Sequence, residues 1–131
     1  MQYLLLIYDN ENIWRDMPKA ESDKMFAEYM QFTTDIKQSG HLIAGDALQP
    51  VSTATTVRVR NGKTQTTDGP FAETKEQLGG YYLIEAKDLD EARKIAERIP
   101  SSRIGSIEIR PVMKFNAGAG NEQYMAGTPK Q

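Results

Sequence analysis

The sequence contains two amphipathic segments, set among short segments that are either apolar throughout or alternate between apolar and polar residues. This pattern predicts an α+β domain with the order strand, helix, strand, strand, helix, strand. Apolar residues recur at three- and four-residue steps over 20–39 and again over 88–99, as on helices that bury one face. An Asn-Gly pair between two alternating runs predicts an additional β-hairpin, inserted between the second and third strands. The order without the hairpin, βαββαβ, is that of the ferredoxin-like fold. The strands are expected at 2–9, 41–48, 80–86 and 106–115.

The first half of the chain begins with an apolar run, Gln2–Asp9, which suits a strand buried on both faces. Asn10–Met17 is polar apart from Trp14 and is predicted to be a loop. The helix that follows ends at Gly40, because glycine readily takes the left-handed conformation of a helix terminus. Its apolar positions, expected to face the core, are Phe26, Tyr29, Met30, Thr33 and Ile36.

In the second half, Asn61-Gly62 predicts a type I′ turn that places Val57 opposite Thr66 and Arg58 opposite Gln65. Thr74–Leu78 is predicted to form one helical turn, with Phe71 filling the core before it. Asp88 resembles the first residue of a capping box, and Pro100 ends the second helix. The apolar stripe of this helix is Leu89, Ala92, Ile95, Ala96 and Ile99.

Composition excludes several kinds of chemistry. The 131 residues contain no cysteine and one histidine, which removes thiolate catalysis, iron–sulfur clusters and sites with two or three histidines. The net charge is 16 − 18 = −2, and no apolar run approaches the roughly 20 residues of a membrane span. The N-terminus lacks the basic start of a signal peptide, so a cytoplasmic protein without membrane contact is expected. We predict no metal and no cofactor.

The predicted domain covers residues 1–115, and residues 116–131 form a tail that is flexible or packed on a partner subunit. Two helices cover one face of the sheet. The other face needs cover as well, and a second copy of the chain is the expected source. A homodimer is therefore predicted.

The run Asp68-Gly69-Pro70-Phe71-Ala72-Glu73-Thr74-Lys75-Glu76, followed by Gly79-Gly80-Tyr81-Tyr82, resembles the DGPF branch of the YCII-related family. Asp90-Glu91-Ala92, Pro100 and Glu108-Ile109-Arg110-Pro111 continue the match. The resemblance implies a ferredoxin-like domain, two of whose sheets pair into a dimeric α/β barrel with a cleft between sheet and helix. It also implies a regulatory setting, because members of this branch often occur beside alternative sigma factors.

One departure from the family affects the expected chemistry. The resemblance implies a His on the first helix and an Asp near the end of the second, proposed as an enzymatic pair. Here Tyr29 occupies the His position and Ile99 the Asp position. That pair is therefore replaced, and acid–base chemistry falls to other residues.

The candidate catalytic residues are Asp68, His41 and Glu73. Asp68, Glu73, Lys75 and Glu76 would form the polar rim of the cleft; alternatively, Asp68-Gly69-Pro70 is only a tight turn. Tyrosines within an apolar pocket can orient a ligand, although core packing is the simpler interpretation. Consecutive tyrosines on a strand point to opposite faces. The predicted ligand-binding residues are Tyr29, Lys75, Glu76, Tyr81, Tyr82 and Arg110.

Two functional hypotheses follow. In the first, the protein binds a small molecule in a cleft of the dimeric barrel, with or without acid–base catalysis, and uses no metal. In the second, it is a non-catalytic regulatory partner, such as a sigma-factor accessory, that binds another protein. The basic residues Arg58, Arg60 and Lys63 lie together on the hairpin, but the chain has neither a basic face nor a recognition helix. Direct nucleic-acid binding is not expected.

Overall fold

A computed structural model of the protein, which describes residues 1–115, confirms the ferredoxin-like α+β fold. Four antiparallel strands form one sheet in the order β2 (Leu42–Ala47), β5 (Gln77–Glu85), β1 (Gln2–Asp9) and β6 (Ser106–Pro111). The first and third strands of the βαββαβ order, β1 and β5, therefore lie at the centre. The tail predicted for residues 116–131 lies outside the described residues, and the domain boundary stays a prediction.

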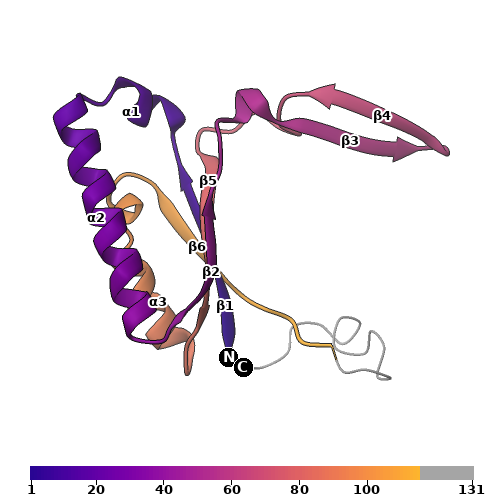
Figure 1. The fold of residues 1–131 in the computed structure, drawn as a ribbon. Helices are drawn as coiled ribbons and strands as arrows, with labels where there is room; N and C mark the ends of the chain where they lie inside the picture. The colour runs from indigo at the N-terminus through magenta and orange to yellow at the C-terminus, as the bar shows by residue number, and fades with distance from the viewer. Residues whose placement is uncertain (116–131) are drawn as a thin grey trace.

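The helices lie on one face of this sheet (Figure 1). The two predicted helices are present as α2 (Lys19–Gln38) and α3 (Leu89–Glu97), and the Asp88 side chain caps α3 by accepting from the Glu91 amide. The prediction of a loop at 10–17 is wrong, because a short helix, α1 (Glu11–Asp16), forms there. Asn10 starts it by accepting a hydrogen bond from the Asn12 amide. No helix within residues 1–115 is long and apolar enough to cross a membrane.

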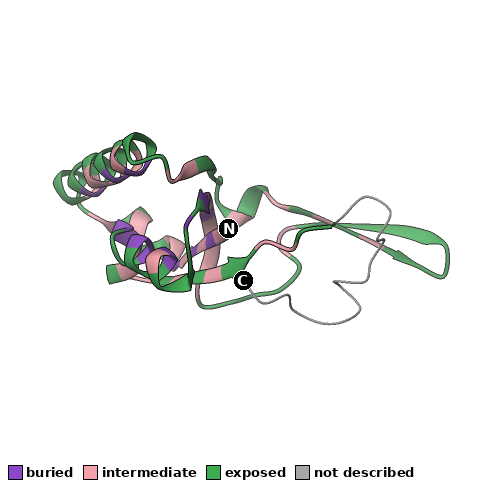
Figure 2. Ribbon diagram, turned by 90° about the horizontal axis from the view of Figure 1, so that it is seen from below, coloured by how far each residue is buried: buried purple, intermediate pink, exposed green. Residues whose placement is uncertain are grey.

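The core lies between the helices and the sheet (Figure 2). Alternate β1 residues are buried there, while Leu4 and Leu6 on the opposite face stay partly exposed in the single chain. Three residues expected in the helical stripes are exposed instead: Phe26, Met30 and Leu89. On α2 the buried positions are Met25, Phe32 and Ile36, so the face turned to the sheet is rotated from the predicted one. The core consists of Tyr3, Leu5, Ile7, Phe32, Ile36, Tyr82, Ile84, Ala86, Ala92, Ile95, Ala96 and Ile99.

The hairpin of β3 (Thr55–Arg60) and β4 (Lys63–Asp68) projects away from the domain (Figure 1). Its predicted register is confirmed, with Val57 opposite Thr66 and Arg58 opposite Gln65. Positive φ angles of 53° at Asn61 and 76° at Gly62 fit the type I′ turn.

The segment that follows the hairpin departs from expectation. The prediction of a helical turn at 74–78 is wrong, because β5 begins at Gln77. Phe71 was expected in the core, but it is 77% exposed. In this segment, side chains donate hydrogen bonds to backbone carbonyls that the backbone amides of a helix would otherwise bond. The Thr74 hydroxyl donates to the Glu76 carbonyl, and the Gln77 amide donates to the Thr74 carbonyl, each at 2.6 Å.

Candidate ligand-binding site

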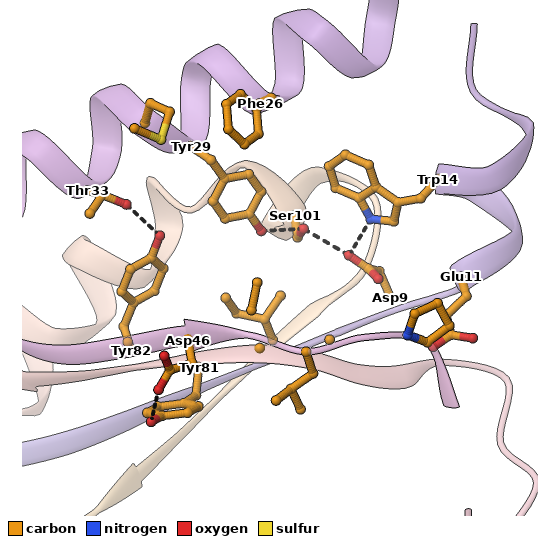
Figure 3. A pocket seen from close by; sticks show the side chains of 18 of the residues that line it. Asp9, Glu11, Trp14, Phe26, Tyr29, Thr33, Asp46, Tyr81, Tyr82 and Ser101 are labelled. Atoms are coloured by element: carbon orange, nitrogen blue, oxygen red, sulfur yellow. Dashed lines mark hydrogen bonds between the residues drawn. The ribbon is translucent and has the colours of Figure 1, made fainter. Parts of the chain in front are cut away.

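A cavity of about 650 Å³ lies between α2 and the sheet, at the end of the domain that α1 closes (Figure 3). Its walls are mainly aromatic and apolar, with few polar groups, which is the usual character of a small-molecule site. The aromatic wall comes from α1 and α2. The lining residues used below are Asp9, Glu11, Trp14, Arg15, Phe26, Tyr29, Met30, Thr33, Gly45, Asp46, Ala47, Gly79, Tyr81, Tyr82 and Ser101.

The principal polar feature of the cavity is the carboxylate of Asp9, the last residue of β1, which is only 5% exposed. Its Oδ2 accepts hydrogen bonds from Trp14 Nε1 and Ser101 Oγ, each at 2.9 Å. Ser101 Oγ in turn accepts from the Tyr29 hydroxyl at 2.5 Å. These four residues, hereafter the Asp9 network, join β1, α1, α2 and the 3-10 helix η2 (Pro100–Arg103).

Within the described part of the chain, only one oxygen of Asp9 accepts side-chain hydrogen bonds. No residue among 1–115 donates a hydrogen bond to Oδ1, although an ionised carboxylate has about four acceptor sites. Burial of an incompletely bonded carboxylate is costly, so a ligand that donates to Oδ1 would lower the free energy of this site.

A close backbone approach makes the Asp9 network possible. A Cβ atom at Gly105 would lie 2.1 Å from the Tyr8 carbonyl oxygen and 2.8 Å from Asp9 Cβ. Only glycine therefore allows the turn after η2 to lie against the end of β1. The Gly105 amide also donates to the Ser101 carbonyl at 2.8 Å, which fixes this turn beside Asp9.

Two tyrosines form the inner part of the cavity. Burial raises the pKa of Tyr29 to about 12, and burial also raises the pKa of Tyr82, so both phenols are neutral hydrogen-bonding groups near neutral pH. The Tyr82 hydroxyl shares a hydrogen bond of 2.7 Å with Thr33 on α2. Gly45 gives the Tyr82 ring its room, because a Cβ there would lie 2.8 Å from that ring.

The rim near α1 carries charged residues that are already engaged. Glu11 Oε2 accepts a hydrogen bond from the Val51 amide at 2.9 Å, and Figure 3 shows Glu11 at the same end of the cavity as Asp9. The Arg15 guanidinium is paired with the adjacent Asp16 at 3.1 Å. Arg15 is the only Lys or Arg among the residues that line the cavity within 1–115.

The structure brings together some of the residues predicted to bind a ligand. Tyr29 and Tyr82 both face the cavity, on the helix side of the sheet. Tyr81 contributes to the lining, but its side chain lies on the opposite side of the sheet from Tyr82, as predicted for consecutive strand residues (Figure 3). Its hydroxyl donates to Asp46 Oδ2 at 2.6 Å, and this hydrogen bond raises the pKa of Tyr81.

The predicted catalytic residues lie elsewhere. The only histidine, His41, follows α2; its ring bonds the Ser39 hydroxyl at 2.6 Å and lies 3.5 Å from Glu91. Asp68 ends β4 opposite Thr55 and is exposed, and Glu73 is exposed as well. The structure does not bring these three residues together or into the cavity.

The remaining predicted ligand-binding residues also lie outside the cavity lining. Lys75 is exposed, Glu76 accepts a hydrogen bond from the Ser106 hydroxyl at 2.9 Å, and Arg110 lies exposed on β6. The segment 68–76 therefore connects the hairpin to β5 and does not form a rim of this cavity.

Sequence reasoning missed Asp9, Trp14 and Ser101. A signal for Asp9 was present, because it shares the alternation that buries Tyr3, Leu5 and Ile7. The resemblance also carried a hint. Tyr29 holds the family's His position, and Ser101, its hydrogen-bond partner, lies two residues beyond Ile99 at the family's Asp position.

The fold and the cavity define a ferredoxin-like α+β protein with a ligand-sized site between its helices and its sheet. Residues 1–116 match the model of the YCII-related domain, and the chain belongs to that family. An uncharacterised protein of Rhizobium meliloti (strain 1021) is 35% identical over 120 residues, which cover 90% of this chain and 97% of that protein.

Among solved structures, the chain is similar to the 5-chloro-2-hydroxyhydroquinone dehydrochlorinase TftG of Burkholderia phenoliruptrix AC1100, in complex with 2,5-dihydroxybenzoquinone. The TM-score is 0.51 at 14% identity, and the match covers 86% of this chain and 94% of that chain. At this identity the likeness shows the shared fold.

Proposed function

We propose that the protein binds a small organic molecule in the cavity between α2 and the sheet, and that Asp9 is its acid–base group. The observation that carries this proposal is the buried Asp9 carboxylate, which has one oxygen held by Trp14 and Ser101 and the other without a donor among residues 1–115. A candidate base needs a free oxygen within hydrogen-bond reach of a bound molecule. Asp9 lines the cavity, and its Oδ1 would be that oxygen.

The rest of the Asp9 network positions this carboxylate. Trp14 and Ser101 fix the orientation of Oδ2, and Tyr29 orients the Ser101 hydroxyl so that its proton points to Asp9. A proton accepted at Oδ1 would thus be taken up by a group with a fixed geometry, and no metal is needed for that step. That a similar fold supports a dehydrochlorinase, as the name of TftG states, is compatible with this chemistry.

Binding is tested with 2-phenylethanol as a neutral probe. The chain has one tryptophan, Trp14 on the cavity wall, so its fluorescence reports on the site directly. We expect saturable fluorescence and NMR shift changes that disappear in Ala47→Phe, whose larger side chain fills the cavity. The matched variant Ala27→Phe lies outside the lining and should bind as the wild type does. Wild-type protein with no response at millimolar probe would contradict the proposal.

We also propose that a second copy of the chain covers the free face of the sheet. The support is a group of partly exposed apolar side chains on that face, Leu4, Leu6 and Leu83, at the centre of the sheet. Exposed apolar surface of this kind is characteristic of interfaces. The homodimer and a cytoplasmic location are expectations that follow from sequence and family.

A protein-interaction role, such as that of a sigma-factor accessory, is the second candidate function. The observation that favours it is the projecting hairpin, where Val57 and Val59 are 60% and 59% exposed on one face. A free strand edge is a common site for partner binding. We expect Val57→Lys with Val59→Lys to abolish binding of a purified alternative sigma factor, whereas Ala47→Phe should not. Equal binding by the hairpin variant and the wild type would contradict this role.

A further inference from the structure

We propose that the cavity selects an organic cation: an amine of about the size of phenylethylamine, whose ammonium group binds Asp9 Oδ1 and whose apolar part lies between Trp14 and the aromatic residues of α2. The inference rests on the proposed function, because it names the class of ligand for the same cavity.

The first argument is the charge of the walls. The charged residues in the lining are Asp9, Glu11, Asp46 and Arg15, a balance of 1 − 3 = −2. The Asp46 carboxylate bonds Tyr81 on the far side of the sheet, which leaves 1 − 2 = −1 at the cavity itself. Arg15 is already paired with Asp16. A bound anion would meet uncompensated negative charge, whereas a cation would neutralise it.

The second argument is the hydrogen-bonding state of Asp9. The residue is only 5% exposed, and its Oδ1 has no donor among the described residues. An alcohol would donate one hydrogen bond to this oxygen and would leave the carboxylate charge without a countercharge. An ammonium group would donate a hydrogen bond in which both partners are ionised, and would also supply the missing countercharge.

The third argument is the aromatic wall. The rings of Trp14 and Tyr29 lie 6.4 Å apart at an angle of 45°, and Phe26 on α2 faces the same space (Figure 3). Aromatic faces attract cations through their quadrupoles, most strongly in sites shielded from water. A cavity of about 650 Å³ lies within the range of small-molecule sites and leaves room for a ring beside the ammonium group.

The test compares three probes of similar shape and different charge: 2-phenylethylamine, 2-phenylethanol and phenylacetate, each titrated against the full chain at neutral pH. Trp14 fluorescence and NMR shifts give the dissociation constants. We expect the amine to bind at least about 10-fold more tightly than the alcohol, a difference of about 1.4 kcal/mol, and phenylacetate to bind most weakly. A quaternary analogue, trimethyl(2-phenylethyl)ammonium, should lose part of the gain, because it keeps the charge but has no N–H donor.

Asp9→Asn should lower amine affinity to that of the alcohol and leave alcohol affinity within about 3-fold. Asp23→Asn removes an equal charge from the exposed surface of α2 and should change neither value. The wild-type probe series tests the inference even if Asp9→Asn fails to fold. Alcohol or phenylacetate binding as tightly as the amine would overturn the selectivity while the proposed cavity function stands. An amine preference retained in folded Asp9→Asn would overturn the role of Asp9, and no binding of any probe would overturn both proposals.

Discussion

The hydroxyl of Ser101 lies 2.9 Å from Oδ2 of Asp9, although 92 residues separate them in the chain. Both residues are buried, and the bond ties η2 to the end of the central strand β1. Because Tyr29 and Trp14 bond the same pair, this contact organises the cavity as well as the fold. The stability of the domain and the geometry of its site should therefore change together when it is broken.

Ser101→Ala tests this coupling. The variant leaves Tyr29 without its acceptor and Asp9 with one donor, and unsatisfied buried groups cost about 1–3 kcal/mol each. We expect the free energy of unfolding in urea to fall by about 2 kcal/mol, with a blue or red shift of Trp14 fluorescence in the folded state. Ser102→Ala is the control, because the Ser102 hydroxyl donates to the Glu97 carbonyl near the surface and is not part of the Asp9 network. Equal effects of the two substitutions would contradict the network.

Gly105→Ala should lower the free energy of unfolding by more than the small size of the added methyl group suggests. The added methyl group would approach the Tyr8 carbonyl oxygen to 2.1 Å, so either β1 or the turn after η2 has to move. Overpacking of this kind costs about 1–3 kcal/mol. Gly79→Ala is the matched control, because its Cβ would meet its nearest neighbour, Asp9 Oδ1, at an ordinary 3.7 Å. Urea denaturation of both variants checks the difference, and comparable losses would argue against the close approach.

Local patterns in the sequence were sufficient for the fold. The Asn61-Gly62 turn, the Asp88 cap and the 3.6-residue period of α2 each have a physical signal within a few neighbouring residues. Helix α1 has one such signal, the Asn10 cap, but its six residues depend as well on the hydrogen bond from Trp14 to Asp9. Short helices of this kind are stabilised by tertiary contacts, which a pattern does not record.

The candidate site was predicted less well, for a related reason. Phe26 and Met30 were expected in the core because an apolar stripe normally packs on a sheet, but here that part of α2 faces a cavity. Asp68 and Glu73 were chosen by residue type within a motif, and that motif connects the exposed hairpin to β5. Of the residues predicted to bind a ligand, only Tyr29 and Tyr82 face the cavity from the helix side of the sheet.

The ionisation of Tyr29 gives a pH-dependent prediction. Burial raises its pKa from 10.0 to about 12, so the folded state keeps this proton after the unfolded chain has lost it. The contribution of Tyr29 to stability is therefore complete below pH 10 and is lost as the pH rises from about 10 to about 12. Tyr29→Phe should show a shallower loss of stability in this window. Tyrosinate absorbance of the folded wild type minus that of the variant should titrate near pH 12, and a midpoint near 10 would contradict burial of this phenol.

Leu6→Arg tests the proposed use of the free sheet face. Leu6 is at the centre of the sheet, between Tyr81 on β5 and Glu108 on β6, with its side chain on the face away from the helices. A buried arginine at a two-fold interface would meet its own copy nearby, and removing its charge from water is costly even with Glu108 opposite it. In a single chain the same side chain reaches water, so the fold should be kept. Sedimentation equilibrium should therefore give the mass of two chains for the wild type and of one chain for Leu6→Arg, with unchanged circular dichroism.

Val59→Arg, on the projecting hairpin, adds the same charge away from this face and should leave the dimer intact. A wild type that sediments as one chain at micromolar concentration would contradict the dimer, and a dimeric Leu6→Arg would place the interface elsewhere.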